Sequence, residues 1–390
     1  MEASITVSSK LPRTGTTIFT VMSRLAAEYN AINLSQGFPD FRVNEELISL
    51  VNRYMQMGMN QYAPMIGEPV LRKAIAAKAE RQHGITLDSD TEITVTAGAT
   101  EAIFNSIAAL VHEGDEIIIL EPAYDCYEPA IRLQKGIVKR VPLRLPEFKV
   151  DWDQVRDLIT RNTRMIIINT PHNPTGTVLS SEDLDSLYSL IADTDIIVLS
   201  DEVYEHIIFD ELSHASVLAH EGLRSRSIAT YSFGKTFHAT GWKVGYVIAP
   251  PAITEEIRKL HQYVTFSVHA PTQFALAEYL KDENNYLELP EFYQSKRDLF
   301  LDLMKDSAFE PVKSSGTYFQ LFSYKDISEL PDMEMAELLT KKHGVAAIPV
   351  SVFYQNEEAH QEQLLRFCFA KTDPTLEKAA EILCKTFPSA

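Results

Sequence analysis

Six short segments between residues 92 and 248 are apolar or β-branched almost throughout, and polar residues, glycine or proline follow most of them. They are residues 92–96, 116–120, 164–168, 196–199, 227–231 and 244–248. Apolar runs of this length predict strands that are covered on both faces. Stretches with apolar residues at helical spacing lie between several of them, as in residues 100–111 and 181–191. This alternation predicts an α/β domain with a largely parallel sheet.

The pattern changes after about residue 283. A charged helical stretch covers residues 293–306, a short β-like segment covers 317–322, and another helix is predicted near 333–343. The first 30–40 residues are polar and poor in glycine, which predicts an arm outside the main sheet. The chain is therefore divided into an N-terminal arm and small-domain segment (1–40), a large domain (41–283) and a small C-terminal α+β domain (284–390).

Composition and charge narrow the classes of function. The 390 residues carry a formal net charge of −18, which argues against nucleic-acid binding because phosphate contacts need clustered Lys and Arg. The cysteines Cys126, Cys368 and Cys384 form no CxxC pair and no zinc-ligand spacing, which favours a reducing compartment and predicts no metal site. The sequence shows no signal peptide and no apolar run near the ~20 residues that span a membrane. We expect a cytoplasmic protein.

Polar residues at three strand ends indicate a specific chemistry. They are Asn173 after residues 164–168, Asp201 and Tyr204 after 196–199, and Lys235 after 227–231. Ligands of parallel sheets gather at the carboxyl ends of the strands. A lysine can form a Schiff base with an aldehyde, and an aspartate can keep a pyridine nitrogen protonated. This set of residues is what a pyridoxal phosphate (PLP) site needs.

Each of these residues also has a simpler interpretation. Asp201 can cap a helix, Asn173-Pro174 is a turn signal, Ser232 can serve a turn, and Lys235 can be a surface lysine. Gly234-Lys235-Thr236 is not a P-loop, because that motif needs a glycine at position 229, where the chain has alanine. A lone histidine such as His172 is more often structural than a ligand or base. The combination of the polar groups favours the PLP interpretation.

Eight motifs give the chain a resemblance to a known family. In chain order they are Ser35-Gln36-Gly37-Phe38-Pro39-Asp40, Asn60-Gln61-Tyr62, Ala97-Gly98-Ala99-Thr100-Glu101, Asn173-Pro174-Thr175-Gly176, Asp201-Glu202-Val203-Tyr204, Ser232-Phe233-Gly234-Lys235, Gly241-Trp242-Lys243-Val244-Gly245 and Arg366-Phe367. The chain resembles the PLP-dependent aminotransferases of class I/II (fold type I), and in particular the methionine and kynurenine aminotransferase branch. The resemblance implies a mostly parallel seven-stranded sheet flanked by helices, plus a smaller α+β domain.

The phosphate of PLP is expected where a strand gives way to a helix. Ala99 and Thr100 lie at this junction, where free backbone N–H groups and the helix dipole attract a dianion. Ser232 adds a hydroxyl donor and Lys243 adds a compact positive charge. The resemblance implies that Tyr62 reaches the phosphate of the neighbouring subunit, and therefore that the protein works as a homodimer.

Four residues are expected around the ring of PLP. Asp201 pairs with the pyridine nitrogen, while Tyr204 and Asn173 donate hydrogen bonds to the phenolic oxygen, which lowers the pKa of the Schiff base. By resemblance, Tyr124 stacks on the ring. Lys235, once released by substrate, moves a proton between the substrate's α-carbon and the aldehyde carbon.

Arg366 is expected to bind the substrate's α-carboxylate, because a guanidinium pairs with a carboxylate through two hydrogen bonds. The other residues that the resemblance places around the substrate are Gly37, Phe38 and Asn173, with Phe19 and Phe353 from pocket-lining segments. The sequence offers no clear second arginine for a side-chain carboxylate. This favours apolar or aromatic donors, and methionine, phenylalanine, tyrosine, glutamine, leucine and kynurenine are candidates by resemblance.

The predicted reaction is a ping-pong transfer of the amino group from such an amino acid to a 2-oxo acid. Two alternatives stay open. The same scaffold and cofactor residues also suit cysteine-conjugate β-elimination, whose products would be ammonia and pyruvate. A non-catalytic PLP-binding regulator is the second alternative; the acidic charge of the chain and the start of the first motif near residue 35 argue against a DNA-binding version of it.

Overall fold

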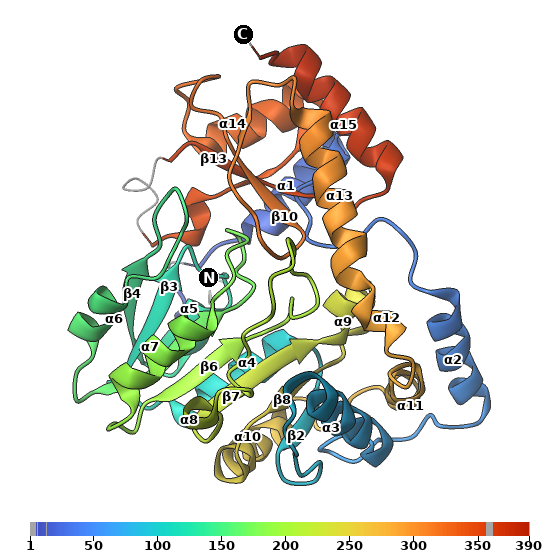
Figure 1. The fold of residues 1–390 in the computed structure, drawn as a ribbon, viewed down its shortest axis with the longest axis vertical. Helices are drawn as coiled ribbons and strands as arrows, with labels where there is room; N and C mark the ends of the chain where they lie inside the picture. The colour runs from blue at the N-terminus through green and yellow to red at the C-terminus, as the bar shows by residue number, and fades with distance from the viewer. Residues whose placement is uncertain (1–4, 6, 13, 356–361, 390) are drawn as a thin grey trace.

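In the computed structural model, which describes residues 5, 7–12, 14–355 and 362–389, the chain is built around a seven-stranded sheet (Figure 1). The strand order is β2-β8-β7-β6-β5-β3-β4. Strand β8 is antiparallel to both neighbours, and all other neighbouring strands are parallel. The strands are β2 (Ile93–Thr96), β3 (Glu116–Glu121), β4 (Ile137–Pro142), β5 (Thr163–Asn169), β6 (Ile197–Asp201), β7 (Ser227–Ser232) and β8 (Gly245–Ile248). The predicted fold class is confirmed.

Six of these strands coincide with the apolar segments of the sequence, and β4 does not. Strand β4 lies at the edge of the sheet beside β3, and most of its residues are half-buried or exposed. It carries Lys139, whose Nζ lies 3.2 Å from Glu116 Oε1 on β3. Because an edge strand is not enclosed on all sides, it needs no continuous apolar run, and the sequence pattern therefore missed it.

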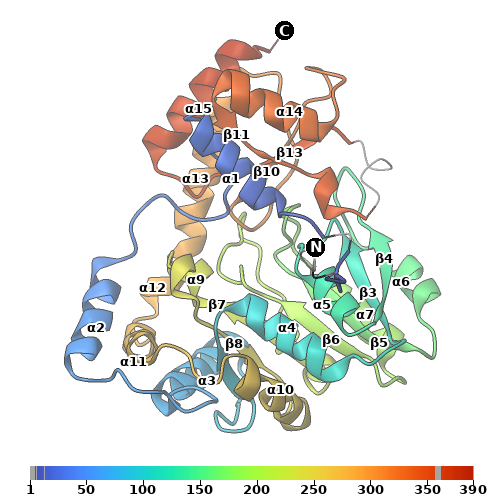
Figure 2. The ribbon, with the colours of Figure 1, turned by 180° about the vertical axis from the view of Figure 1, so that it is seen from behind.

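Helices cover both faces of the sheet. Since successive side chains of a strand point to opposite faces, Ile117 and Ile119 of β3 pack in one layer, whereas Ile118 and Leu120 pack in the other. The first layer includes α4 (Ala99–Leu110), α5 (Tyr127–Leu133) and α10 (Pro251–Val264), and the second includes α3 (Pro69–His83), α6 (Trp152–Leu158) and α7 (Ser181–Ile191). Figure 2 shows α4 lying across the sheet.

The C-terminal part of the chain forms a smaller α+β unit beside the sheet (Figure 1). Its four strands have the order β12-β13-β10-β9, and each neighbouring pair is antiparallel. Its elements are α13 (Leu289–Met304), β9 (Glu310–Pro311), β10 (Phe319–Ser323), α14 (Asp332–Leu338), a π-helical turn (Leu339–His343), β12 (Ile348–Pro349), β13 (Leu364–Cys368) and α15 (Asp373–Thr386). The helices predicted near 293–306 and 333–343, and the strand predicted at 317–322, are found here within a few residues.

The N-terminal segment joins this smaller unit. Helix α1 (Ile18–Glu28) leads to β1 (Ile32–Asn33), which pairs in parallel with β11 (Val345–Ala346). Figure 2 shows α1 among the C-terminal elements. Residues 1–4, 6 and 13 of the predicted arm lie outside the described residues, as do residues 356–361 and 390 of the predicted small domain. The domain boundaries near 40 and 283 stay a prediction.

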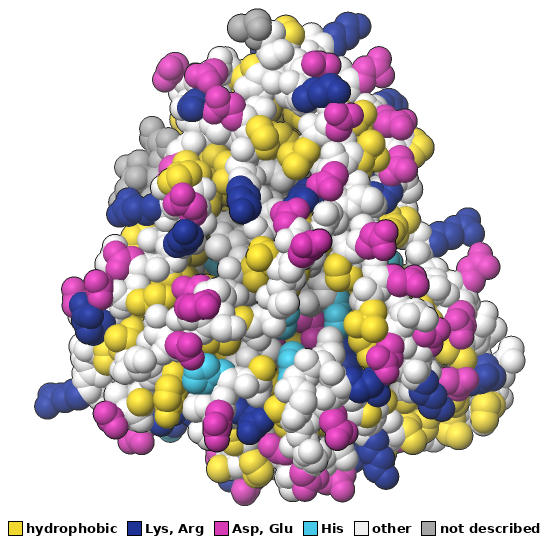
Figure 3. Space-filling view, viewed as in Figure 1, with side chains coloured by type: hydrophobic (Ala, Val, Ile, Leu, Met, Phe, Trp, Pro, Cys, Tyr) yellow, Lys and Arg dark blue, Asp and Glu magenta, His cyan; other side chains and the backbone are white. Residues whose placement is uncertain are grey.

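The remaining helices connect or flank these units. They are α2 (Glu45–Gln56), α8 (Glu221–Arg224), α9 (Phe233–Thr236), α11 (Ala270–Tyr279) and α12 (Asn284–Leu287), with 3-10 turns at Thr240–Trp242 and Ser351–Phe353. In the part of the chain that the structure describes, none of the helices combines the length and the apolar character required to cross a bilayer. Acidic and basic side chains are interspersed on the face shown in Figure 3.

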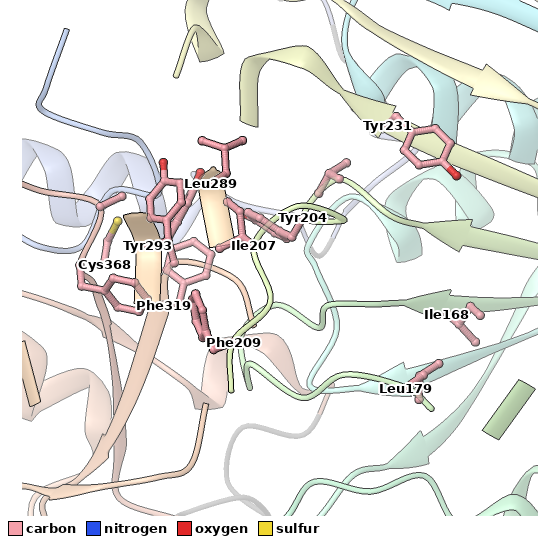
Figure 4. Packing of buried hydrophobic residues seen from close by; sticks show 14 of the residues in the cluster. Ile168, Leu179, Tyr204, Ile207, Phe209, Tyr231, Leu289, Tyr293, Phe319 and Cys368 are labelled. Atoms are coloured by element: carbon pink, nitrogen blue, oxygen red, sulfur yellow. The ribbon is translucent and has the colours of Figure 1, made fainter. Parts of the chain in front are cut away.

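The carboxyl ends of β5, β6 and β7 meet the smaller unit, and this junction holds the candidate site. In the sheet, Asn169 is in register with Asp201. Figure 4 shows Tyr204, from the loop after β6, in one cluster with Tyr293 of α13 and Phe319 of β10. The Tyr204 and Phe319 rings meet edge-on with their centroids 6.1 Å apart. Segments from both units therefore meet at the carboxyl ends of the strands, where ligands of parallel sheets bind.

Candidate active site

Lys235 lies in the short helix α9, which begins directly after β7. Ser232 caps this helix, accepting a hydrogen bond from the Lys235 backbone N–H at 3.3 Å. The Lys235 Nζ donates to the Tyr318 hydroxyl at 2.9 Å and to the Gly37 carbonyl at 3.2 Å. Burial lowers the pKa of Lys235 to about 8. An appreciable fraction of this amine is therefore neutral, and so nucleophilic, near neutral pH.

Asp201 is the last residue of β6, and its carboxylate is buried. One carboxylate oxygen accepts a hydrogen bond from the Tyr127 hydroxyl at 2.7 Å, and the other accepts one from the Val203 backbone N–H at 3.4 Å. Burial raises the pKa of Asp201 to about 6. No helix of the described chain begins between Asp201 and α8, so the helix-cap interpretation does not apply. A cationic group placed beside this carboxylate would stabilise its charged form.

Glu202 anchors the same segment from its other side. It accepts hydrogen bonds from the Tyr231 hydroxyl at 2.8 Å and from His214 Nε2 at 2.9 Å. Burial opposes ionisation of Glu202, but His214 and hydroxyl donors outweigh it and hold the pKa at about 2. Because Glu202 follows Asp201 and Tyr231 precedes Ser232, the bond between them fixes the ends of β6 and β7 relative to one another.

A buried ion pair lies near Glu202, and its contribution to the stability of the protein can be measured. Lys78 Nζ of α3 lies 2.7 Å from Glu205 Oε1, and each side chain is 5% exposed. We expect Lys78→Met to lower the free energy of unfolding by about 3–5 kcal/mol, because Glu205 would remain as a buried charge without its partner. Urea denaturation measures this loss.

A surface pair supplies the control for that measurement. Lys325 and Glu310 pair at 2.8 Å with more than half of each side chain exposed, at 56% and 54%. The urea curve of Lys325→Met should match that of the unmodified protein, since exposed pairs contribute little. A Lys78→Met curve that also matched it would show that the buried pair adds nothing to stability.

Arg366, on β13, is a buried cation with neutral partners. It is 1% exposed, and its guanidinium donates to Asn173 Oδ1 at 2.8 Å and to the Ser35 carbonyl at 3.2 Å. Its Nε has no hydrogen-bond partner among the described residues, and no carboxylate among them forms an ion pair with it. The guanidinium carbon lies 3.8 Å from the centroid of the Phe319 ring, and burial lowers the pKa of Arg366 to about 10. Such a group favours an anionic ligand.

The start of α4 and Lys243 form a second anion-binding arrangement. Gly98 precedes the helix with φ 86°, and Lys243 adopts a left-handed conformation at the end of a 3-10 turn. A Cβ atom on Gly98 would come within 3.2 Å of Lys243 Nζ, so glycine keeps the space between the helix start and this ammonium open. The first N–H groups of a helix have no partner inside it. Together these groups form a cradle suited to a phosphate.

Lys235, Asp201, Arg366 and the groups at the start of α4 line one cavity of about 290 Å³. The predicted site residues that line it are Phe19, Gly37, Ala99, Thr100, Tyr124, Asn173, Asp201, Tyr204, Ser232, Lys235, Lys243 and Arg366. Tyr62 lies elsewhere, 84% exposed on the surface, with its ring 5.6 Å from that of Phe266. Phe38 is 44% exposed, and Phe353 lines a neighbouring cavity while its ring lies 5.4 Å from the Arg366 guanidinium.

Four further residues of the site were missed in the sequence. They are Tyr127, Asn169, Tyr318 and Phe319. Asn169 accepts a hydrogen bond from the Asn173 backbone N–H at 2.8 Å, and its place at the end of a predicted strand was a usable signal. The three aromatic residues gave no such signal, because an aromatic side chain in a helix or strand is by default a core residue.

The chain is similar to known proteins over nearly its whole length. Residues 29–383 match the model of the family described as aminotransferase class I and II. The chain belongs to the class I and II aminotransferases. It is 53% identical to a methionine aminotransferase of Escherichia coli over 96% of this chain and 97% of that protein. It is 37% identical to a kynurenine–oxoglutarate transaminase of Dictyostelium discoideum over 95% of this chain and 94% of that protein.

A solved structure of this aminotransferase family matches the fold closely. It is an Escherichia coli protein whose structure and reactivity are described as identifying a methionine aminotransferase function. The TM-score is 0.95 at 52% sequence identity, and the match covers 98% of this chain and 100% of that one. The predicted family, its methionine and kynurenine branch and the aminotransferase activity are thereby confirmed. The roles of the single residues in the aminotransferase site stay predictions.

Proposed function

We propose that this aminotransferase binds PLP in the cavity and moves the amino group of an apolar, aromatic or sulfur-containing L-amino acid to a 2-oxo acid. One observation carries the proposal. A single cavity brings together the amine of Lys235, the buried carboxylate of Asp201 and the buried guanidinium of Arg366. Within the described residues, the Lys235 amine has no carboxylate partner and the Arg366 Nε has no hydrogen-bond partner. The amine, the carboxylate and the guanidinium match the aldehyde of PLP, its ring nitrogen and the carboxylate of the substrate.

The residues of the cavity fit PLP part by part. The cradle of Gly98, the start of α4 and Lys243 suits the phosphate, with the Ser232 hydroxyl beside it. Asp201 suits the protonated ring nitrogen, and Tyr204 and Asn173 suit the phenolic oxygen. Tyr124 supplies an aromatic face for the ring. When bound, PLP supplies an electron sink that stabilises negative charge at the substrate's α-carbon.

The substrate is held and selected by the chain's own side chains. Arg366 binds the α-carboxylate, and Asn173, 2.8 Å from the guanidinium, fixes the orientation of that guanidinium. Among the described residues, the charged side chains that line the cavity are Asp201, Lys235, Lys243 and Arg366. All four have a role, so no cation remains for a carboxylate on the substrate's side chain. Apolar walls such as Phe319 favour methionine or aromatic donors.

Lys235 moves the proton in this proposal. Its neutral Nζ accepts the proton from the substrate's α-carbon. This C–H bond must break before the nitrogen can be transferred. A base works best when its pKa lies near the working pH, and the pKa of Lys235, about 8, meets that condition. The reaction then runs in two half-reactions, with the amino group kept in the site between them.

An absorbance titration tests the proposed function. Purified protein with PLP is titrated with methionine and then with a 2-oxo acid. We expect the band of enzyme-bound PLP to disappear with methionine and to return with the 2-oxo acid, while 4-methylthio-2-oxobutanoate accumulates. A band that no amino acid changes would contradict transamination at this site. Release of ammonia and pyruvate from a cysteine conjugate would instead indicate β-elimination.

The pKa of Lys235 sets the pH dependence of PLP capture by the cofactor-free protein. Only the neutral amine attacks an aldehyde, and burial places the pKa of Lys235 at about 8 rather than at the ordinary value of a lysine. Below that pKa the rate constant of capture should rise about tenfold per pH unit, and above it the rate should level off. Stopped-flow absorbance measures this; a rise that continued beyond pH 10 would contradict a lowered pKa.

We also propose that the enzyme is a homodimer in which Tyr62 serves the partner's site. Tyr62 is 84% exposed and is absent from the residues that line the cavity of its own subunit. Further exposed apolar side chains are Met57, five positions before Tyr62, and Phe266, whose ring contacts that of Tyr62. A surface of this kind on one chain suits burial against a second copy.

Mixed dimers test the shared site. When Lys235→Ala and Tyr62→Ala proteins are mixed and allowed to exchange subunits, each mixed dimer has one site with both defects and one intact site. Activity should rise above that of either variant, toward about a quarter of the unmodified activity for random pairing. No rise despite proven subunit exchange would place Tyr62 in its own subunit's site or in none.

A reducing, cytoplasmic location belongs to the same proposal. Cys126, Cys368 and Cys384 are all free thiols in the structure. Unpaired cysteines suit a compartment that keeps thiols reduced.

A further inference from the structure

Two oxygen atoms from distant parts of the chain accept hydrogen bonds from the amine of Lys235. Lys235 Nζ lies 2.9 Å from the hydroxyl oxygen of Tyr318, which precedes β10, and 3.2 Å from the carbonyl oxygen of Gly37. The Tyr318 hydroxyl also donates to the same Gly37 carbonyl at 2.6 Å. Because the single phenolic proton is used on Gly37, the Tyr318 oxygen faces Lys235 as an acceptor.

The surroundings of this amine are aromatic, and the part of the chain that the structure describes offers it no carboxylate partner. Lys235 Nζ lies 5.6 Å from the centroid of the Tyr204 ring and 5.4 Å from that of Tyr318. Tyr318 is 0% exposed. Among the described residues, no Asp or Glu oxygen comes within ion-pair distance of Lys235. A lysine that served only structure would be expected to pair with a carboxylate when buried.

This geometry matches the hydrogen-bonding capacity of a neutral amine. A neutral amine has two N–H bonds and one lone pair, and the two oxygens accept both N–H bonds. The lone pair is then the one position on nitrogen left open, and Lys235 lines the cavity. An amine fixed in this way presents its basic site to whatever lies in the cavity.

We propose that Tyr318, together with the Gly37 carbonyl, is a positioning dock for the released amine of Lys235 during proton transfer. The proposal deepens the proposed function and rests on it. Tyr318 does not touch the reacting carbon; it acts through Lys235, holding the nitrogen so that its lone pair is available. The dock joins the two units, since Tyr318 belongs to the smaller unit and Lys235 follows β7 of the large sheet.

The packing around the dock leaves little freedom to either oxygen. A Cβ atom on Gly37 would lie 2.7 Å from the Phe319 ring, so the backbone of Gly37 sits directly against that side chain. The Tyr318 ring also packs against the Tyr293 ring, at a centroid distance of 5.8 Å. Figure 4 shows Tyr293 and Phe319 in the same cluster. The Tyr318 hydroxyl is therefore held by packing as well as by its hydrogen bonds.

Tyr318→Phe, with Tyr293→Phe as its control, tests the dock. Both changes remove one hydroxyl from a buried tyrosine, but the Tyr293 hydroxyl has no hydrogen-bond partner in the described structure. The first measurement uses the cofactor-free protein: the pKa of Lys235 is obtained from the pH dependence of its labelling by trinitrobenzenesulfonate, located by peptide mapping. An oxygen acceptor stabilises an ammonium more than an amine, so we expect Tyr318→Phe to lower this pKa by about one unit.

The second measurement uses the PLP-loaded enzyme and the half-reaction with methionine. Loss of positioning should slow that half-reaction by about 10- to 100-fold and raise the isotope effect of α-deuterated methionine, because proton transfer becomes more limiting. The apparent Kd of methionine should change less than about twofold. Tyr293→Phe should match the unmodified enzyme in both measurements.

The outcomes separate this proposal from the proposed function. An unchanged Lys235 pKa, or a slower half-reaction with an unchanged isotope effect, would overturn the dock. Equal effects in Tyr293→Phe would also overturn it, because loss of packing would then explain both variants. Failure of the unmodified enzyme to convert methionine would contradict the proposed function, whereas the labelling experiment on the cofactor-free protein would still test the contact between Tyr318 and Lys235.

Discussion

Lys235→Ala is expected to lower methionine transamination by at least about 10⁴-fold, because one change removes both the nucleophile for PLP and the base for the α-proton. The only other amine that lines the cavity among the described residues is Lys243, which lies beside Gly98 at the phosphate cradle. It is therefore committed to a different part of the site. Single-turnover absorbance with methionine measures the loss.

Two controls separate lost chemistry from lost folding in this variant. Among the described residues, the Lys235 amine donates hydrogen bonds to Tyr318 and Gly37 and forms no ion pair, so its removal should leave the urea denaturation curve of the protein close to the unmodified one. The shortened side chain also leaves room for a small amine. Added methylamine should restore part of the proton-transfer rate, which a misfolded protein would not show. A Lys235→Ala enzyme with the full rate would refute the assignment.

Arg366→Lys is expected to lower kcat/KM for methionine by about 10²-fold or more, although the charge is kept. A lysine replaces a planar fork with a single point charge, so one of the two charge-assisted hydrogen bonds to the carboxylate is lost. It also loses the stacking on Phe319, where the guanidinium carbon lies 3.8 Å from the ring centroid. Steady-state kinetics over a range of methionine concentrations measure the change.

A substrate analogue and a second arginine sharpen this test. 3-(Methylthio)propylamine lacks the carboxylate of methionine, so the preference of the enzyme for methionine over this amine should shrink in Arg366→Lys. Arg297 is also buried, at 7% exposure, but it pairs with Asp210 at 2.7 Å outside the cavity. Arg297→Lys should lower stability and leave the preference intact. A preserved preference in Arg366→Lys would mean that another group binds the carboxylate.

Local patterns predicted much of the fold because they record burial directly. Strands β3, β5 and β6 are covered on both faces, so each needs an apolar run, and each run was visible. The helix predicted at 181–191 has the same bounds as α7, whose start is marked by a capping box of Ser180 and Asp183. Strand β4 carries no apolar run, because the edge of a sheet does not require one.

Candidate site residues were predictable where function places a polar group in an otherwise buried position. Asp201, Asn173 and Lys235 stand out because a polar residue at the end of a buried strand, or within a few residues of it, has few structural reasons to be there. Tyr318 does not stand out, because a tyrosine next to a strand is by default part of the core. Its link to Lys235 spans 83 positions of the chain, and no local pattern expresses such a contact.

The sequence by itself determined the fold class, the family and the set of polar groups at the ends of β5, β6 and β7, since strand burial and strand ends are local properties. Only the tertiary structure decided which partners those groups have. The Arg366 guanidinium contacts Asn173 and Phe319, and Lys235 contacts Tyr318 and Gly37, because the smaller unit packs against the carboxyl ends of these strands. Contacts of this kind depend on which distant segments come together. The packing of the two units against each other determines this.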